Sequence, residues 1–94
     1  MPTTPVITDP PNGASGLGLN PRFFGTADAY YSVEIVQANT GHPYGKGVAN
    51  ENGVWAIDIR MDSDQWLTFS ARSYVSPDDP NSYSAYSVPI TIQA

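Results

Sequence analysis

Apolar and polar residues alternate along this chain in short runs, which is the pattern of β-strands with one face in a core. Val33 and Ile35 fall on one face of their run and Glu34 on the other, and the stretch from Val54 to Arg60 alternates in the same way. No stretch carries apolar residues at helical spacing without an interrupting Gly or Pro. We therefore expect a structure built almost wholly from strands.

Seven such runs are separated by turn-forming residues, with about 8–12 residues from one strand to the next, which is typical of a sandwich. The first run is expected at a sheet edge because Pro5 and Pro10 flank it and proline cannot donate to a ladder. The fold predicted is an all-β, immunoglobulin-like sandwich of about seven antiparallel strands in two sheets. Its predicted strands are Val6–Thr8, Arg22–Ala27, Ser32–Gln37, Lys46–Ala49, Val54–Arg60, Trp66–Tyr74 and Ser87–Gln93.

The phase of each run predicts its buried face. Asn52-Gly53 is typical of a type I′ hairpin turn between the fourth and fifth strands. Gly25 is small and would let the facing sheet approach, whereas Glu34 and Asp58 have the opposite phase from the core and are expected to face water. The predicted core consists of Phe23, Val33, Ile35, Trp55, Ile57, Ile59, Leu67, Phe69, Val88, Ile90 and Ile92.

Length and charge limit what such a domain can do. Ninety-four residues form one domain, and we expect it to have been excised from a longer protein, with Met1 as an added start. Four basic residues stand against nine acidic ones, and they are scattered, which argues against nucleic acid and anionic membranes as partners. The absence of cysteine excludes disulfides and thiolate metal sites, and no apolar run is long enough to span a membrane.

Several short motifs follow one another along the chain. They are Pro5-Val6-Ile7-Thr8, Phe24-Gly25-Thr26-Ala27, Ser32-Val33-Glu34-Ile35, Asn52-Gly53-Val54-Trp55-Ala56-Ile57, Leu67-Thr68-Phe69-Ser70-Ala71-Arg72, the serines Ser84 and Ser87, and Val88-Pro89-Ile90-Thr91-Ile92. Their order resembles a known family, the bacterial immunoglobulin-like (Big-type) repeats of surface adhesins and some secreted enzymes and toxins. The resemblance implies a non-catalytic structural or adhesive module in an exported protein, located at the cell surface or outside the cell. Its partners would be neighbouring domains of the same chain, and a host-surface protein or glycan.

The segment from Ser73 to Tyr86 departs from that family, being longer and richer in Tyr and Pro than the loop common in those repeats. Trp66 lies one residue out of phase with its strand's core positions and is expected to point outward or to cap one end of the sandwich. Exposed aromatic rings can stack on sugars or on a protein partner. Four residues, Trp66, Tyr74, Tyr83 and Tyr86, are therefore candidate ligand contacts. They leave a second function open, a carbohydrate-binding module attached to a secreted hydrolase, and a third reading in which the rings only cover strand edges.

Catalytic and metal chemistry have weaker signals. His42 is the single histidine and lies between Gly41 and Pro43 in a predicted loop, so we expect no catalytic triad and no enzyme activity. Turn carboxylates could bind calcium, although no loop reproduces a full ligand spacing. These carboxylates are Asp9, Asp62, Asp64, Asp78 and Asp79. We expect no other cofactor.

Overall fold

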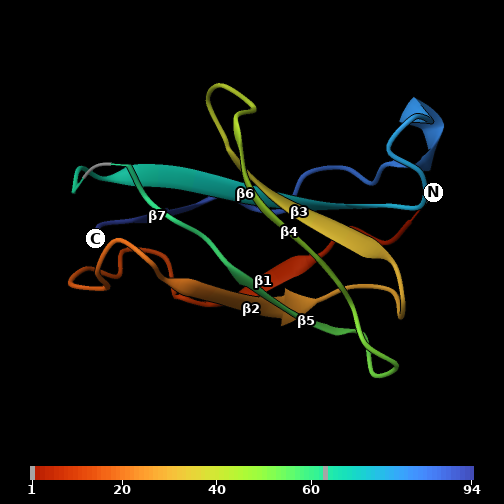
Figure 1. Ribbon diagram of the computed structural model, residues 1–94, viewed down its shortest axis with the longest axis horizontal. Coiled ribbons are helices and arrows are strands. Elements are labelled where there is room, and N and C mark those ends of the chain that lie inside the picture. Colours follow the sequence, from red (N-terminus) through yellow and green to blue (C-terminus); the bar gives the residue numbers. More distant parts are fainter. Residues whose placement is uncertain (1, 63) are drawn as a thin grey trace.

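Two antiparallel sheets pack face to face in the computed structural model, which describes residues 2–62 and 64–94 (Figure 1). The three-stranded sheet has the order β1 (Val6–Asp9), β2 (Arg22–Thr26), β5 (Val54–Asp58). The four-stranded sheet has the order β4 (Pro43–Val48), β3 (Ser32–Gln37), β6 (Leu67–Tyr74), β7 (Ile90–Ile92). A 3₁₀ turn, η1 (Pro80–Ser82), precedes the last strand segment. The predicted seven-stranded sandwich is confirmed, including β1 at a sheet edge.

The fourth strand lies in the sheet of β3 and β6, whereas constant-type immunoglobulin domains place it with the first, second and fifth strands. The Asn52-Gly53 turn therefore joins strands of different sheets, and the prediction of a type I′ hairpin is wrong. Asn50 N donates to Val54 O (2.9 Å), Gly53 N donates to Asn50 O (2.9 Å), and within the turn only Gly53 has a positive φ, of 75°. This is a three-residue turn that ends on a left-handed glycine.

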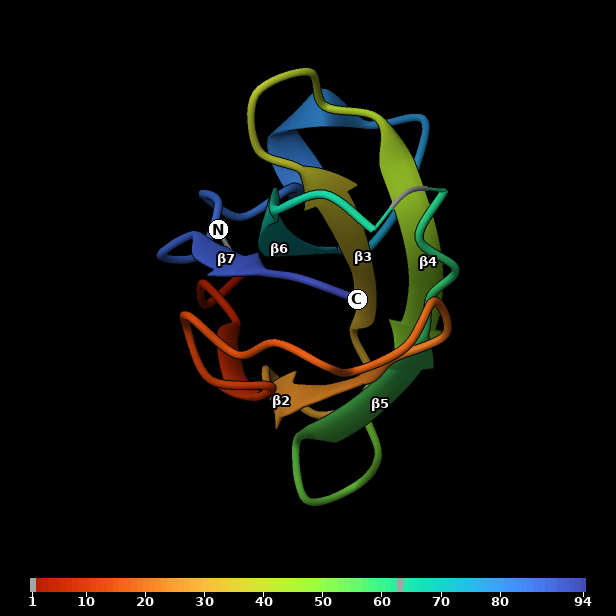
Figure 2. The ribbon, with the colours of Figure 1, turned by 90° about the vertical axis from the view of Figure 1, so that its left-hand side faces the viewer.

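One side of the sandwich is closed by two glycines on the inner face of β4. A Cβ at Gly45 would lie 2.7 Å from Ile57 Cγ2, and one at Gly47 would lie 2.9 Å from Ile57 Cγ1. Because neither position has a side chain, β5 packs directly on the backbone of β4, as seen along the long axis (Figure 2).

The core largely follows the predicted phase. Phe23, Val33, Ile35 and Trp55 are at most 1% exposed, and Met61, which was not predicted, is as deeply buried. Others of the predicted set, Ile57, Ile59, Phe69, Ile90 and Ile92, are also buried, and Leu67 is half-buried against them.

Gly25 has no side chain, and this leaves room for neighbouring residues of its own sheet. A Cβ there would lie 2.2 Å from Trp55 Cζ2 and 2.0 Å from Val6 O. The indole of Trp55, from the adjacent strand, occupies that space and donates from Nε1 to Thr26 O (3.0 Å). Gly25 thus makes room for a side chain of β5 and the backbone of β1, and the expected approach of the facing sheet is not its role.

Val88 contradicts the prediction most clearly, since it is 84% exposed. The cause is the spacing of the segment that borders β6. Ser84, Ser87 and Ile90 are buried and bond or pair with Ser73, Ala71 and Phe69, respectively. This segment therefore advances three residues for every two of β6. The extra residues act as bulges, and strict alternation from Ile90 back to Val88 does not hold.

The two ends of the chain lie at opposite ends of the long axis (Figure 1). The molecule measures 34 × 27 × 18 Å along its principal axes. Among the residues described, no helix has the length and apolar character needed to cross a membrane.

Candidate functional site

The outer face of the four-stranded sheet, which points away from the core, is unusually well covered. In a two-layer sandwich such a face is open to water, yet Glu34, Val36, Ser70 and Tyr74 are each at most 8% exposed. The connection between β3 and β4 and the segment that follows β6 both rise above this face (Figures 1 and 2). These two segments form walls on either side of the sheet surface.

An ion pair crosses the middle of the outer face. Arg72 Nε donates to Glu34 Oε1 at 2.5 Å, and the two residues are direct cross-strand neighbours. Burial alone would lower the pKa of the Arg72 guanidinium. The hydrogen bond and negative charge of Glu34, together with smaller contributions from Tyr86 and Tyr83, outweigh burial, so the pKa is raised above its ordinary value. Glu34 has the outward phase expected of it, but the prediction that it faces water is wrong because Arg72 covers it.

Three of the four predicted ligand contacts gather around Arg72. Its guanidinium carbon lies 4.1 Å from the ring centroid of Tyr83 and 4.9 Å from that of Tyr86, within cation–π range. The Tyr83 ring stacks on Tyr74 with centroids 4.9 Å apart, and its hydroxyl donates to Pro77 O at 3.2 Å. Tyr74 is 7% exposed beneath this stack, whereas Tyr86 is 47% exposed and is the ring most open to a ligand.

The irregular part of the tyrosine-bearing segment is shorter than the stretch from Ser73 to Tyr86 that the sequence singled out. Tyr83 already pairs with Tyr74 as an isolated antiparallel bridge, so only residues 75–82 leave the sheet. Asp79 accepts from Asn81 N at 3.0 Å and caps η1, and Ser82 Oγ donates to Ser76 O at 2.7 Å. These bonds hold the two ends of the loop together.

Beside the tyrosines lies a groove of about 370 Å³. Val36 and Ser70, a cross-strand pair of the outer face, form its floor. Ser70 is 4% exposed, and its hydroxyl makes no hydrogen bond with any residue that the structure describes. The walls of the groove are Ala38 and Gly41 on one side and Tyr86, Ser87 and Pro89 on the other.

Sequence reasoning missed Val36 and Ser70. The available signal was the pair Ile35-Val36, two adjacent apolar residues in a strand that otherwise alternates. One of the two must point away from the core, and a valine on an outer face that is nonetheless buried indicates a covered surface.

Trp66 does not belong to this cluster. It immediately precedes β6, whose far end carries Tyr74, so along the strand the two are separated by roughly 25 Å. Trp66 is 51% exposed and stands apart from the other rings. The four residues predicted together therefore form one group of three and one separate side chain.

The candidate calcium ligands are dispersed. Asp62 accepts from the Tyr44 hydroxyl (3.2 Å) and Asp79 caps η1. Within residues 2–62 and 64–94, no three histidine or acidic side chains come together as a metal site. His42 is exposed and packs edge-on against Tyr44, with centroids 5.1 Å apart.

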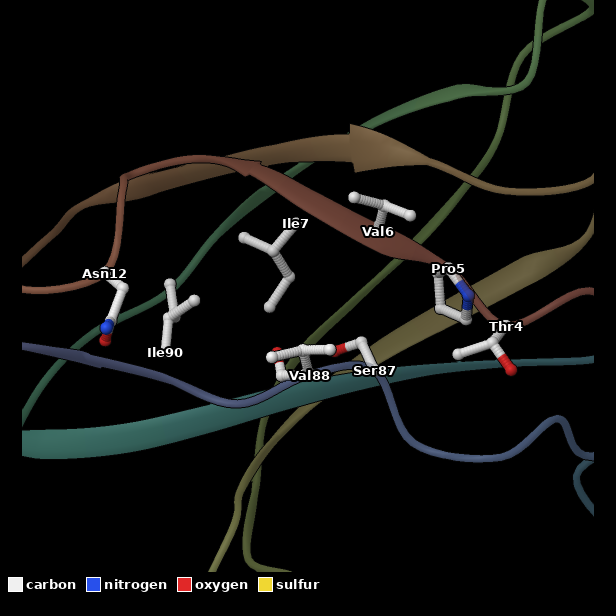
Figure 3. Close-up of a pocket in the computed structure, with 8 residues that line it drawn as sticks. All are labelled: Thr4, Pro5, Val6, Ile7, Asn12, Ser87, Val88 and Ile90. Carbon is white, nitrogen blue, oxygen red and sulfur yellow. The ribbon is translucent and has the colours of Figure 1, made fainter.

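A second hollow, of about 420 Å³, lies where the sandwich is open between β1 and the segment before β7. Figure 3 shows Ile7 pointing from β1 toward Ser87 and Val88. Asn12 and Ser87, two of its polar members, already bond to the backbone, Asn12 Oδ1 accepting from Thr91 N and Ser87 Oγ from Ala71 N. This hollow, which we call the seam, offers mainly apolar packing.

Comparisons with known proteins bear on the fold. No family model and no curated protein matches the chain. Solved structures do match, and one of them, described as a protease, has a TM-score of 0.55 and 23% identity over 100% of this chain. The match covers 18% of that protein's chain, so this chain spans about a fifth of its length. At this identity the likeness shows the fold alone.

Proposed function

We propose that this chain is a non-catalytic, structural and adhesive immunoglobulin-like module of a larger exported bacterial protein, and that it binds through the outer face of its four-stranded sheet. The observation that carries this proposal is the groove with its free Ser70 hydroxyl, placed beside the exposed ring of Tyr86. Ligand contacts usually come from loops held on a rigid scaffold, and both groove walls are of that kind.

The fixed shape of the walls supports an adhesive role. Ser84 and Ser87 fasten the tyrosine-bearing segment to β6 through both main-chain and side-chain bonds. A surface that is ordered before it binds loses less conformational entropy on binding than a mobile one. That a similar fold makes up about a fifth of a larger protein described as a protease supports a module within a longer chain.

A carbohydrate-binding module of a secreted hydrolase is the second candidate. It is supported by the half-exposed Tyr86 ring, which could stack on a sugar. Both candidates use the same face and differ in the partner.

The test uses the biotinylated domain assembled into tetramers, because linking sites strengthens weak binding. Retention is measured on intact epithelial cells, on immobilised matrix proteins and on a glycan array. The matched variants are Ala38→Trp, which fills the groove from its wall, and Ala56→Trp, which places the same side chain on the outer face of the other sheet.

We expect retention on at least one of these surfaces, at least about tenfold weaker for Ala38→Trp and unchanged for Ala56→Trp. No retention on any of them would contradict an adhesive module. Equal losses in both variants would contradict the assignment to this face.

A further inference from the structure

We propose that the groove binds an extended protein segment that places an apolar side chain between its walls and an acidic residue beside it. This inference rests on the proposed adhesive function and names its partner class. The apolar side chain would lie on Val36 between Ala38 and Tyr86. The acidic residue would lie over the neighbouring row formed by the cross-strand residues Lys46, Glu34 and Arg72.

The lining is built for an apolar group. The side chains of Val36, Ala38 and Pro89 are purely hydrocarbon, and Tyr86 adds an aromatic ring to the lining. Ser87 Oγ is occupied, since it accepts from Ala71 N at 2.8 Å. A buried aliphatic or aromatic side chain would pack on these walls and bring no polar atom of its own that needs a partner.

Ser70 supplies the polar contact that an extended chain needs. A hydroxyl can donate one hydrogen bond and accept others, and this one has no partner among the described residues. A main-chain N–H or C=O next to the inserted side chain can bond to it. The site thus matches one side chain and the backbone that carries it.

Charge on the outer face selects the neighbouring residue of the partner. Lys46, Glu34 and Arg72 form a row across β4, β3 and β6, next to the row of Val36 and Ser70. Two cations and one carboxylate give this row a net charge of +1 within a chain of net charge −5. Lys46 is exposed and has no ion pair within the described chain, so it can attract a carboxylate.

A sugar fits the groove less well. A pyranose carries several hydroxyls, and each one that is buried without a partner costs about 1–3 kcal/mol. The groove side chains offer the free hydroxyl of Ser70 and that of Tyr86 at the rim. The observations therefore favour a peptide over a glycan.

The experiment selects random peptides displayed on phage with the intact biotinylated domain, and then measures synthetic versions of the enriched peptides by calorimetry. We expect enriched sequences in which an aliphatic or aromatic residue lies within two positions of Asp or Glu. Ala38→Trp should weaken binding at least about tenfold, and Ala56→Trp should leave it unchanged.

Two further variants separate a binding role from a structural one. Ser70→Ala should weaken peptide binding by about three- to tenfold, the usual effect of one hydrogen bond, without lowering the urea midpoint. Lys46→Glu should weaken binding and favour peptides whose acidic residue is replaced by Lys. Loss of stability in Ser70→Ala, or a preference of the wild-type domain for basic peptides, would overturn the proposal.

The outcomes also separate this inference from the proposed function. If cells or glycans retain the tetramer through this face and no peptide is enriched, the peptide class is wrong and the adhesive module stands. If no surface retains the tetramer, the proposed function itself fails.

Discussion

Ser84 and Ser87 each supply a hydrogen bond that a regular strand would supply from its backbone. Ser73 N donates to Ser84 Oγ at 2.9 Å, and Ala71 N donates to Ser87 Oγ at 2.8 Å. Both donors belong to fully buried residues of β6. Replacing either serine with alanine leaves a buried N–H with no acceptor.

The expected loss is about 1–3 kcal/mol for each variant, the usual cost of a buried group left unsatisfied. Ser84→Ala should lie at the upper end of this range. Ser87 lines both the groove and the seam, so water can enter and bond to Ala71 N, which places Ser87→Ala at the lower end. A domain of this size has roughly 5–14 kcal/mol in total, so the double variant should be severely destabilised.

Urea unfolding followed by tryptophan fluorescence measures the midpoints, and amide hydrogen exchange reports on the two β6 groups directly. We expect the amide of Ser73 to exchange faster in Ser84→Ala and that of Ala71 in Ser87→Ala. Ser15→Ala is the control, because Ser15 is exposed and has no side-chain hydrogen bond within the described chain.

Unchanged midpoints in both variants, together with unchanged exchange at Ser73 and Ala71, would refute this account. The segment from Ser84 to Ile90 would then pair with β6 through its backbone, in regular alternation. Val88 would in that case point inward, as its position in the sequence first suggested.

Three other predictions follow from the core, the last strand segment and the surface. Trp55→Ala removes a side chain that is 1% exposed and its bond to Thr26 O, so it should cost about 3–5 kcal/mol and lower the urea midpoint sharply; a small shift would contradict the packing of the indole. Val88→Ser should change the free energy of unfolding by less than about 0.5 kcal/mol, because Val88 is 84% exposed. A larger loss in the same titration would show that Val88 is buried in the core. The hydrogen bond from Arg22 holds the pKa of Asp58 below its ordinary value, so this exposed pair stabilises the fold above about pH 4 and the effect is lost as pH falls through the lower folded-state pKa. Asp58→Asn should therefore lower the midpoint slightly at pH 7 and low salt, and the difference from wild type should vanish in acid and shrink in high salt; a difference that persists in acid would argue against the ion pair.

Alternation along single strands was enough to predict much of the fold. Side chains of a strand change faces at every residue, so the inward phase of Val33, Ile35, Trp55 and Ile57 follows from their own neighbours. Trp66 was correctly expected to point outward, for the same reason.

The errors arise where a neighbouring segment decides the outcome. Val88 points outward because the segment before β7 advances three residues for every two of β6. This spacing depends on two serine hydroxyls that accept hydrogen bonds from β6 residues more than ten positions away in the sequence. The Asn52-Gly53 turn has the local chemistry of a hairpin, but the sheet that β4 joins is set by its pairing with β3.

The candidate site could be predicted only in part. Tyr74, Tyr83 and Tyr86 were singled out as large rings near a loop, and they do gather around Arg72. The groove beside them depends on Val36 and Ser70, which become a floor only because two segments rise on either side of the sheet. Burial of an outer face cannot be deduced from the strand that carries it.

The position of the chain ends has a mechanical consequence. Because they lie at opposite ends of the 34 Å axis, a pull on both ends acts nearly along the strands. Force in that direction shears the β1–β2 and β6–β7 ladders, so that their hydrogen bonds share the load and do not open one after another. Once the fold yields, 94 residues extend to roughly 320 Å, about nine times the folded span. In an anchored chain, a single domain of this kind would therefore act as a stiff link at low tension and as a long extensible tether above its yield force.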